Sequence, residues 1–356
     1  MKVLFFVDDF KGGAGNVVQL LSMELKRRNH SITICCLGGR TPSRYNLEGV
    51  VVHRLPSSHN KGIRYVHHVI DSRNVIKREK PDCIVSFLFG VSAFVNLAIL
   101  GLHIPLIVSE RSDPHYLKPT GLLLVLTELA YKRAKSIVVL FDGFKDIAGN
   151  RYRDKVVVIP NPVPKIEIAR LEPHDFQKEI HFVTIANDTP PKGLDILVSA
   201  FSIVCKKYPN AILRIYGYQK DENLKNMITE KKIDGNIQLM GYTLDVKEPL
   251  SWADVYVMPS RHEGFPNSLC EAMSAGKCCI ATLCHEGIKD LIEDEVNGLL
   301  TKVNDVEALA EKISYIIDNS DKIQKIGGEA ENIYNKYNLN LITDMWEHEI
   351  KKHIIL

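Results

Sequence analysis

Short apolar runs recur along the chain at spacings that predict buried strands. In the first half of the chain they are KVLFFV, SITICCL, CIVSFLF, PLIVS, SIVVL and KVVVIP. Longer stretches with helical periodicity, such as NVVQLLSMELKRRN, separate these runs. A continuous apolar run between helical stretches is typical of a parallel strand that crossover helices cover on both faces. The first half therefore predicts a doubly wound α/β domain.

The same alternation restarts after IPNPVP, at residues 159–164. Its apolar runs are HFVTIA, AILRIYG, IQLMGY, ADVYVMPS, KCCIAT and NGLLT, with LDILVSAFSIVCKKY as one helical stretch between them. Because prolines interrupt and stiffen a chain, the proline-rich segment is the natural linker. The expected fold class is α/β, with two doubly wound Rossmann-like domains whose ligand-binding strand ends face each other across a cleft.

The domain boundaries follow from this linker. We expect an N-terminal domain over residues 1–162 and a C-terminal domain over residues 163–339. The closing segment, 340–356, lies in a stretch with helical periodicity, NLNLITDMWEHEIKKH. A closing helix usually packs on its own domain, but we expect this one to cross back to the N-terminal domain.

Composition places the chain among soluble globular proteins. Of its 356 residues, 45% are hydrophobic and 25% are charged, and no run is long and apolar enough to span a bilayer. The N-terminus, MKVLFFVDDF, has too short an apolar run for a signal peptide and is interpreted as a strand. The eight cysteines form no C-x-x-C pair and lie mostly in apolar runs. We therefore expect reduced, buried thiols in a cytoplasmic protein.

Charge is divided unevenly along the chain. Residues 1–160 hold 23 Lys and Arg against 13 Asp and Glu, whereas the remainder holds 22 against 30. A basic first domain suits an anionic membrane surface or a phosphorylated substrate, although opposite charges also help two halves to pack.

Residues 116–135 combine a cluster of leucines with Lys132 and Arg133. They predict a basic amphipathic helix on the inner face of the plasma membrane, with a core-facing helix as the alternative. We expect no nucleic-acid partner.

The stretch RHEGFPNSLCEAMSAG, residues 261–276, holds two carboxylates on either side of a glycine-proline turn. Glu263 follows a predicted strand, and Glu271 lies in the helix after the turn. Ser268-x-x-Glu271 has the form of a capping box, in which Glu271 only caps its own helix. The functional alternative is that the free amides at the helix start bind a phosphate. Glu271 then accepts hydrogen bonds from ribose hydroxyls, and Glu263 contacts a sugar.

Several motifs lie in the same order as in a known enzyme family. They are FKGGAGNVVQLLSMEL, PDCIVSFLFG, LIVSERSDP, VVVIPNPV, PPKGLDILVSAF, SRHEGFPNSLCEAMSAG and EDEVNGLL. With Glu263 and Glu271 in the spacing Glu-x7-Glu, they resemble the family-4 retaining glycosyltransferases of the GT-B fold over nearly the whole chain. The combination SFLFG, VSERSDP and IPNPV is similar to bacterial capsule and exopolysaccharide transferases of the amylovoran type.

This resemblance implies roles for individual residues. Glu271 binds the nucleotide ribose, and Glu263 contacts the donor sugar near its reacting face. Lys192 neutralises the diphosphate leaving group, on which negative charge grows as the glycosidic bond breaks. Gly13 lets the backbone approach the diphosphate or the acceptor. The residues whose backbone faces the sugar and phosphate are Gly264, Phe265, Pro266 and Asn267. The ordinary alternatives are a solvated loop lysine for Lys192 and a steric turn for Gly13.

Three places depart from the family pattern, and one of them is His285-Glu286-Gly287, where relatives often have Pro-x-Gly. Where relatives carry an arginine before the lysine, this chain has Asn187, which can donate hydrogen bonds but brings no charge. One diphosphate cation is therefore missing, or Arg261 or Arg111 replaces it. Where many relatives have a histidine, this chain has Glu110 and Arg111, with His115 further along. These three are candidate acceptor or phosphate contacts, and an exposed Glu110–Arg111 ion pair is the alternative.

The resemblance implies a retaining hexosyltransferase. Its donor is a nucleotide diphosphate sugar, expected to be UDP-linked, with a hexose or an N-acetylhexosamine as the sugar. Its acceptor is a lipid-diphosphate-linked glycan of a surface polysaccharide. No cluster has metal-ligand spacing, and relatives act without a metal, so no cofactor is expected. A catalytically degenerate protein, which Asn187 favours, and a sugar-nucleotide epimerase are the alternatives.

Overall fold

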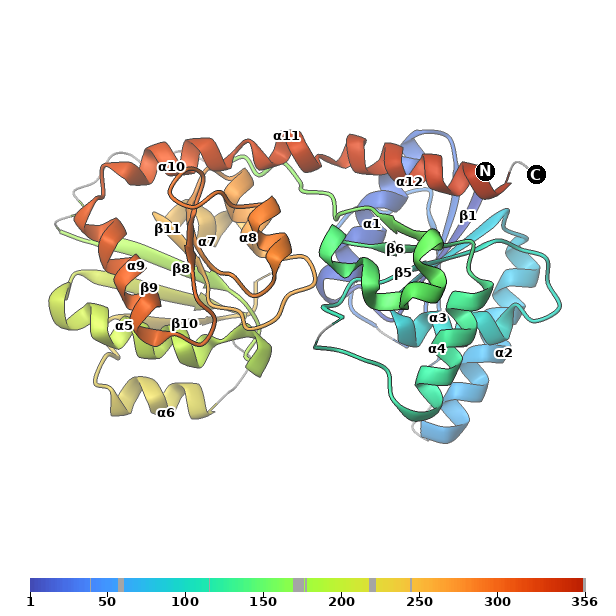
Figure 1. Ribbon diagram of the computed structural model, residues 1–356, viewed down its shortest axis with the longest axis horizontal. Coiled ribbons are helices and arrows are strands. Elements are labelled where there is room, and N and C mark those ends of the chain that lie inside the picture. Colours follow the sequence, from blue (N-terminus) through green and yellow to red (C-terminus); the bar gives the residue numbers. More distant parts are fainter. Residues whose placement is uncertain are drawn as a thin grey trace. The chain divides into compact units, whose positions relative to one another are not determined.

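The computed structural model describes residues 1–38, 40–56, 61–114, 116–168, 176, 178–217, 222–243 and 245–354. The chain divides into two compact units. One comprises Met1–Pro162 with Leu339–Leu356, and the other comprises Val163–Asn338. Each unit is built on one sheet of parallel strands, against which its helices pack (Figure 1).

The first unit has a seven-stranded sheet in the order β3-β2-β1-β4-β5-β6-β7, with parallel pairing between all neighbours. Its elements in chain order are β1 (Lys2–Val7), α1 (Gly12–Arg27), β2 (Ser31–Cys36), β3 (Val51–Arg54), α2 (Lys61–Glu79), β4 (Cys83–Phe87), α3 (Phe89–Ala98), β5 (Leu106–Ser109), α4 (Gly121–Arg133), β6 (Ser136–Val139), η1 (Asp142–Ala148), η2 (Asn150–Lys155), β7 (Val156–Val158) and α12 (Leu339–Ile354). Strand β3 was not predicted, because its four residues are only partly buried and form no apolar run.

The second unit has a six-stranded sheet in the order β10-β9-β8-β11-β12-β13, again with parallel pairing. Its elements are β8 (Ile180–Ile185), η3 (Pro190–Lys192), α5 (Leu194–Lys207), β9 (Ala211–Tyr216), α6 (Glu222–Glu230), β10 (Ile237–Gly241), α7 (Lys247–Trp252), β11 (Val255–Met258), α8 (Asn267–Ser274), β12 (Cys278–Thr282), η4 (Glu286–Asp290), β13 (Leu299–Thr301), α9 (Val306–Asp318), α10 (Lys322–Ala330) and α11 (Ile333–Tyr337). Both sheets have the strand order expected of a doubly wound fold, so the predicted fold class is confirmed.

The core of each unit explains why these sequences fold as they do. Every residue of β4 and β12 is buried, as continuous apolar runs require. Helix α5 buries Leu194, Leu197, Val198 and Phe201 along one face, which is the 3.6-residue period of a helix on a sheet. Phe201 packs edge-on against Phe182 of β8, with ring centroids 5.6 Å apart. Each large apolar side chain buried in this way contributes roughly 1.5–3 kcal/mol.

Helix α12 packs on α1, and it therefore belongs with the N-terminal half of the chain (Figure 1). Trp346 is completely buried and stacks on Phe87, with ring centroids 5.8 Å apart. Arg28, just beyond α1, donates to a carboxylate oxygen of Glu347 at 3.0 Å. The structural boundary before this helix falls at Leu339, one residue earlier than expected.

Candidate active site

The second unit has a topological switch point at the carboxyl ends of β8 and β11. From β8 the chain continues to β9 and β10 on one side, and it returns to β11, which pairs with β8 and leads to β12 on the other. Loops that leave two adjacent parallel strands in opposite directions form the usual ligand site of such sheets. Lys192 follows β8 and Glu263 follows β11. Two predicted side chains thus come from the two sides of this point.

Lys192 and Glu263 form an ion pair at the switch point. Lys192 Nζ donates to both carboxylate oxygens of Glu263, at 2.8 and 2.9 Å. The Ser260 hydroxyl donates to Glu263 Oε1 at 2.7 Å. The side chains of Lys192 and Glu263 are 28% and 9% exposed, and charge-assisted hydrogen bonds of this length are stronger than neutral ones. The alternative of a solvated loop lysine is therefore wrong.

The turn that carries Lys192 depends on Gly193. Gly193 ends η3 in the left-handed region, with φ +66°. A Cβ at this position would lie 2.1 Å from the carbonyl oxygen of Pro259, at the end of β11. Only glycine combines this φ with such a close approach. The turn after β8 can therefore lie directly against the loop after β11.

Arg261 links the loop after β11 to the turn that carries Lys192. Its backbone amide donates to the carbonyl oxygen of Pro191 at 2.7 Å. Its guanidinium binds both carboxylate oxygens of Asp195, at 2.7 and 2.6 Å, and its Nε donates to Asn304 at 2.6 Å. The hydrogen bonds that Arg261 donates to the Asp195 carboxylate raise the pKa of Arg261. This cation, considered above as a replacement for the missing arginine, is already paired with a carboxylate.

Asn187 lies on the exposed surface between β8 and η3. Its side-chain oxygen accepts a hydrogen bond from the Thr189 hydroxyl at 2.7 Å. Between residues 186 and 193, Lys192 is the only lysine or arginine in the sequence. The loop after β8 therefore contributes a single cation to this edge of the sheet.

Helix α8 begins at Asn267, with Pro266 in the N-cap position and no side-chain cap hydrogen bond. The capping-box prediction is therefore wrong. Ser268 lies inside the helix, where its hydroxyl oxygen accepts a hydrogen bond from the Tyr256 hydroxyl at 2.8 Å. Glu271 stands in the second turn, too far along to cap the helix, and is only 6% exposed. The capping explanation for a glutamate at this position no longer applies.

The two predicted glutamates lie close to the same buried groups. Burial raises the pKa of the Cys270 thiol well above its usual range, and the charges of Glu271 and Glu263 raise it further. Burial also raises the pKa of Tyr256, with further contributions from Glu263 and Glu271. Both carboxylates therefore act on the same two buried groups, Cys270 and Tyr256.

The segment between the two glutamates is anchored by Phe265. Its side chain is 6% exposed and packs edge-on against Tyr337, with ring centroids 6.0 Å apart. The Asn267 amide donates to the carbonyl oxygen of Phe265 at 2.9 Å. Gly264 and Pro266 flank this anchored residue. The donor contacts of these four residues stay predictions.

In the first unit, Gly13 lies in the first turn of α1 rather than in a loop after β1. The closest backbone approach belongs to a glycine that the sequence analysis did not single out. A Cβ on Gly15 would lie 2.5 Å from the carbonyl oxygen of Asp9. The run Gly12-Gly13-Ala14-Gly15 is the sequence signal that marks this close packing of α1 against the end of β1.

Glu110 and Arg111 follow β5, and they are only 2% and 7% exposed. The alternative of an exposed ion pair is therefore wrong. Arg111 Nη1 donates to the side-chain oxygen of Asn161 at 3.0 Å, and its guanidinium lies 5.2 Å from the ring centroid of Trp346. Arg111 thus joins the end of β5 to the proline-rich linker and to α12. His115 lies outside the described residues.

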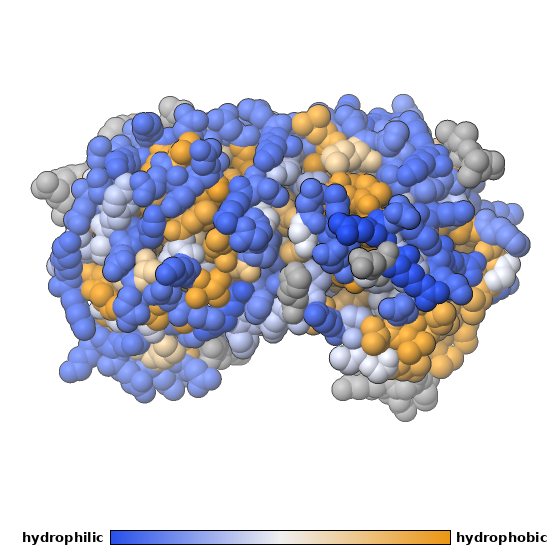
Figure 2. Space-filling view, viewed as in Figure 1, coloured by the Kyte–Doolittle hydropathy of each residue, from blue (hydrophilic) through white to orange (hydrophobic). Residues whose placement is uncertain are grey.

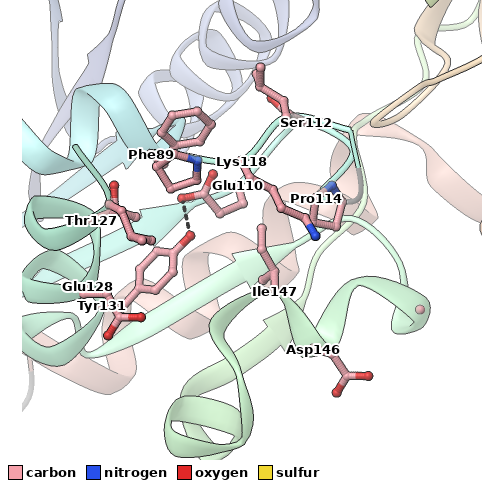
Figure 3. Close-up of a pocket in the computed structure, with 14 residues that line it drawn as sticks. Phe89, Glu110, Ser112, Pro114, Lys118, Thr127, Glu128, Tyr131, Asp146 and Ile147 are labelled. Atoms are coloured by element: carbon pink, nitrogen blue, oxygen red, sulfur yellow. Dashed lines mark hydrogen bonds between the residues drawn. The ribbon is translucent and has the colours of Figure 1, made fainter. Parts of the chain in front are cut away.

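Glu110 lines a pocket of about 370 Å³ in the first unit (Figure 3). The Tyr131 hydroxyl donates to Glu110 Oε1 at 3.0 Å. Within the described part of the chain, the buried Oε2 has no hydrogen-bond partner. Burial raises the pKa of Glu110 to about 7, although the Tyr131 hydroxyl, the Phe89 amide and Arg111 act against it. A second pocket, of about 450 Å³, adjoins the first and shares Phe89, Ser112 and Leu117 with it.

The described residues hold neither a metal-binding cluster nor a membrane-spanning helix. They contain no group of three or more His, Cys, Asp or Glu side chains placed to hold a metal ion. None of their helices has the length and apolar character needed to cross a membrane. Six of the eight cysteines are buried.

Two family models match adjoining parts of the chain. Residues 11–165 match Glycosyltransferase Family 4, and residues 167–333 match Glycosyl transferases group 1. Together they span most of both units. The chain therefore belongs to the family-4 glycosyltransferases of the GT-B fold, and the predicted family is confirmed.

Relatives and solved structures agree with this assignment. A Campylobacter jejuni enzyme, named as an α-1,4-N-acetyl-D-galactosaminyltransferase acting on GalNAc-α-(1→4)-GalNAc-α-(1→3)-diNAcBac-PP-undecaprenol, is 24% identical over 355 residues, which cover 97% of each chain. An amylovoran biosynthesis glycosyltransferase of Erwinia amylovora is 28% identical over 178 residues, 45% of this chain and 44% of its own. An Anabaena protein in complex with UDP-glucose shares the fold, with a TM-score of 0.83 and 18% identity over 99% of this chain and 100% of its own.

Proposed function

We propose that this glycosyltransferase is a retaining enzyme that moves a hexose or an N-acetylhexosamine from UDP to a lipid-diphosphate-linked glycan in surface polysaccharide synthesis. The observation that carries the proposal is the Lys192–Glu263 ion pair at the switch point of the second unit. A cation and a carboxylate held together at a strand edge suit a ligand with both a diphosphate and sugar hydroxyls.

The donor binds between the loops after β8 and β11. Lys192 pairs with the diphosphate, and Glu263 accepts hydrogen bonds from the sugar. The first amides of α8 and the helix dipole attract a phosphate, while the buried Glu271 accepts hydrogen bonds from the ribose. Asn187 donates a hydrogen bond in place of the missing cation. UDP is the proposed nucleotide because a protein of the same fold holds UDP-glucose.

The transfer step needs no enzyme nucleophile. The bond between the anomeric carbon and the diphosphate oxygen breaks, and the acceptor oxygen forms a bond to that carbon on the same face. The proton of the acceptor hydroxyl passes to the departing phosphate oxygen. Lys192 stabilises the charge that develops on the leaving group, which is where a fixed cation has its largest effect on the rate.

The first unit provides the acceptor side of this proposal. On α4, Leu122, Val125 and Leu129 are 74%, 54% and 46% exposed, and Figure 2 shows apolar side chains gathered on the surface over this helix. Lys132 and Arg133 lie in its last turn. An exposed apolar face with basic residues suits the interface of an anionic membrane, where lipid-linked acceptors lie. The inner face of the plasma membrane is the proposed location.

A thermal-stability screen with UDP-, GDP-, dTDP- and ADP-sugars tests the donor. A ligand that binds only the native state raises the Tm. We expect UDP-sugars to stabilise the wild type but not Glu271→Ala, the variant that lacks the ribose contact. No stabilisation of folded wild-type protein by any of these nucleotides contradicts the proposal.

The stereochemistry of transfer is tested on the product. NMR of the new glycosidic linkage should show the α configuration of an α-linked UDP-sugar, because transfer occurs on the same face. A β product contradicts retention. UDP-sugar binding without transfer to any lipid-linked glycan would instead indicate the catalytically degenerate protein.

A further inference from the structure

The pocket beside Glu110 has a wall that is largely apolar. It lies at the carboxyl end of β5, where α4 and η1 contribute to its lining (Figure 3). Its apolar lining residues are Phe89, Pro114, Leu117, Pro119, Leu124 and Ile147. Phe89 lies beside the Glu110 carboxyl in Figure 3, and Ile147 lines the same pocket. The pocket therefore suits a ligand with an apolar face.

Charge in this pocket disfavours a polyanion. Among the described residues, its charged lining side chains are three carboxylic acids, Glu110, Glu128 and Asp146, and one cation, Lys118. Even when Glu110 is protonated, the acidic side chains outnumber the cation. A diphosphate would meet net negative charge here, whereas hydroxyl and amide groups would find hydrogen-bond acceptors.

Within the described ranges, Glu110 carries a buried oxygen without a hydrogen-bond partner at this pocket. Its Oε1 accepts the Tyr131 hydroxyl at 3.0 Å, whereas its buried Oε2 has no partner among the described residues. A buried oxygen without a hydrogen bond is costly. Such atoms are rare in folded proteins, and each calls for an explanation. A ligand that donates a hydrogen bond to Oε2 removes this cost.

We propose that this pocket binds one uncharged sugar residue of the acceptor glycan, with Glu110 as the specificity-determining contact. This inference rests on the proposed function and deepens it, because it assigns a sugar rather than the lipid diphosphate to the end of β5. A hydroxyl or acetamido N–H of the sugar donates to Glu110 Oε2. The apolar face of the ring packs on Phe89 and Ile147.

Methyl-selective NMR tests the binding. With labelled isoleucine methyl groups, Ile147 reports on the pocket, and the buried Ile288 in the second unit serves as the reference. The uncharged probes are methyl α-glucoside and methyl α-N-acetylglucosaminide, and the charged probes are glucose 1-phosphate and farnesyl diphosphate. We expect an uncharged probe to shift Ile147 and not Ile288. No shift with either uncharged probe, or tighter binding of a charged probe at Ile147, overturns the inference.

A pair of variants isolates the contribution of Glu110. Glu110→Leu/Tyr131→Phe removes both hydrogen-bonding partners together, which leaves no orphaned hydroxyl in the core. Tyr131→Phe alone retains the carboxyl and is the matched control. Glycoside binding should weaken about tenfold or more in the double variant relative to this control, as expected for the loss of one good hydrogen bond. Equal affinities in the two variants overturn the role of Glu110.

The donor assay separates this inference from the proposed function. UDP-sugars should stabilise the double variant as much as the wild type, because Glu110 lies in the other unit. Stabilisation by UDP-sugars without glycoside binding at Ile147 overturns the acceptor inference alone. Glycoside binding at Ile147 without any stabilisation by nucleotide sugars overturns the proposed donor, and the sugar pocket stands.

Discussion

Lys192 Nζ lies 2.8 and 2.9 Å from the two carboxylate oxygens of Glu263, a residue 71 positions later in the chain. The contact exists because the loops after β8 and β11 meet at the switch point of the sheet. Each residue keeps the other in place before a donor arrives. Preorganised charge of this kind stabilises a transition state without a cost of reorganisation during the reaction.

Replacing Lys192 should therefore slow transfer more than it weakens the fold. In Lys192→Met, we expect kcat to fall roughly 10²–10³-fold, the usual effect of losing one group that stabilises a leaving group or oxyanion. The rate of UDP release from a UDP-sugar, with acceptor present, measures this loss. Lys325→Met, at an exposed position of α10, is the matched control. A Lys192 variant as active as this control would contradict the assigned role.

The proposed contact between Glu271 and the ribose can be tested by combining a Glu271 variant with deoxy analogues of the donor in a thermodynamic cycle. Glu271→Ala should weaken UDP-sugar binding by roughly 10–100-fold, as expected for lost hydrogen bonds to a charged acceptor. The 2′-deoxy or 3′-deoxy analogue of the UDP-sugar should show a similar loss with the wild type. Calorimetry should then find little further loss when variant and analogue are combined. Fully additive losses for both analogues would mean that Glu271 does not contact the ribose hydroxyls.

Gly193 should tolerate no side chain. Gly193→Ala places a Cβ 2.1 Å from the Pro259 carbonyl oxygen at a φ of +66°, so the backbone has to shift. We expect a destabilisation of roughly 2–4 kcal/mol in urea unfolding. Gly328→Ala in α10, where no atom lies within 4 Å of the added Cβ, is the control and should be neutral or stabilising. Equal stability of the two variants would show that the turn relaxes without cost.

The attachment of α12 to α1 should depend on pH. Burial raises the pKa of the Glu347 carboxyl, but hydrogen bonds from Lys351, Arg28 and His30 outweigh burial and lower it to about 2. A depressed carboxyl pKa contributes stability above the unfolded value, 4.5, and this stability is lost as the pH falls toward 2.

Thermal unfolding of Glu347→Gln measures this contribution. The variant should be less stable than the wild type at pH 7 by roughly 1–2 kcal/mol. The difference should shrink steadily as the pH falls below 4.5. Glu222→Gln, at an exposed position of α6, is the control and should show no such trend. A difference that stays constant with pH would assign the effect to packing rather than to charge.

Membrane association should depend on the exposed face of α4. Leu122→Glu/Val125→Glu replaces two side chains that are 74% and 54% exposed, so folding should be unaffected. Cosedimentation with vesicles that contain anionic lipid should fall several-fold, and binding of the wild type should weaken with added salt. Ile203→Glu, at a 41% exposed position of α5, is the control. Unchanged vesicle binding of the double variant would exclude this face.

Elements of secondary structure were predictable because their signals are local. The apolar runs located β1, β4, β8 and β12 to within a residue or two, since strands buried on both faces are largely apolar. Strand β3 was missed because an exposed edge strand needs no such run. The capping box was also misjudged, because Pro266 and the Tyr256–Ser268 hydrogen bond decide how α8 begins.

The site was predictable as a set of residues but not as an arrangement. Glu263 and Glu271 were singled out by their spacing about the glycine-proline turn, and Lys192 by motif resemblance. The ion pair between Lys192 and Glu263 could not be predicted from the sequence, because no local signal connects positions that are 71 residues apart. The ion pair between Arg261 and Asp195 could not be predicted from the sequence either, because Asp195 lies on a different element.

The sequence by itself determined the α/β alternation, the place of the linker and the identity of the polar residues after each strand, because periodicity and turn residues act over a few positions. Only the tertiary structure decided which of those residues meet and which are buried. Glu110 is buried because Tyr131 of α4 covers it, and Arg111 is buried because Trp346 of α12 lies over it. Both partners come from distant parts of the chain, and burial and charge pairing are properties of the assembled neighbourhood.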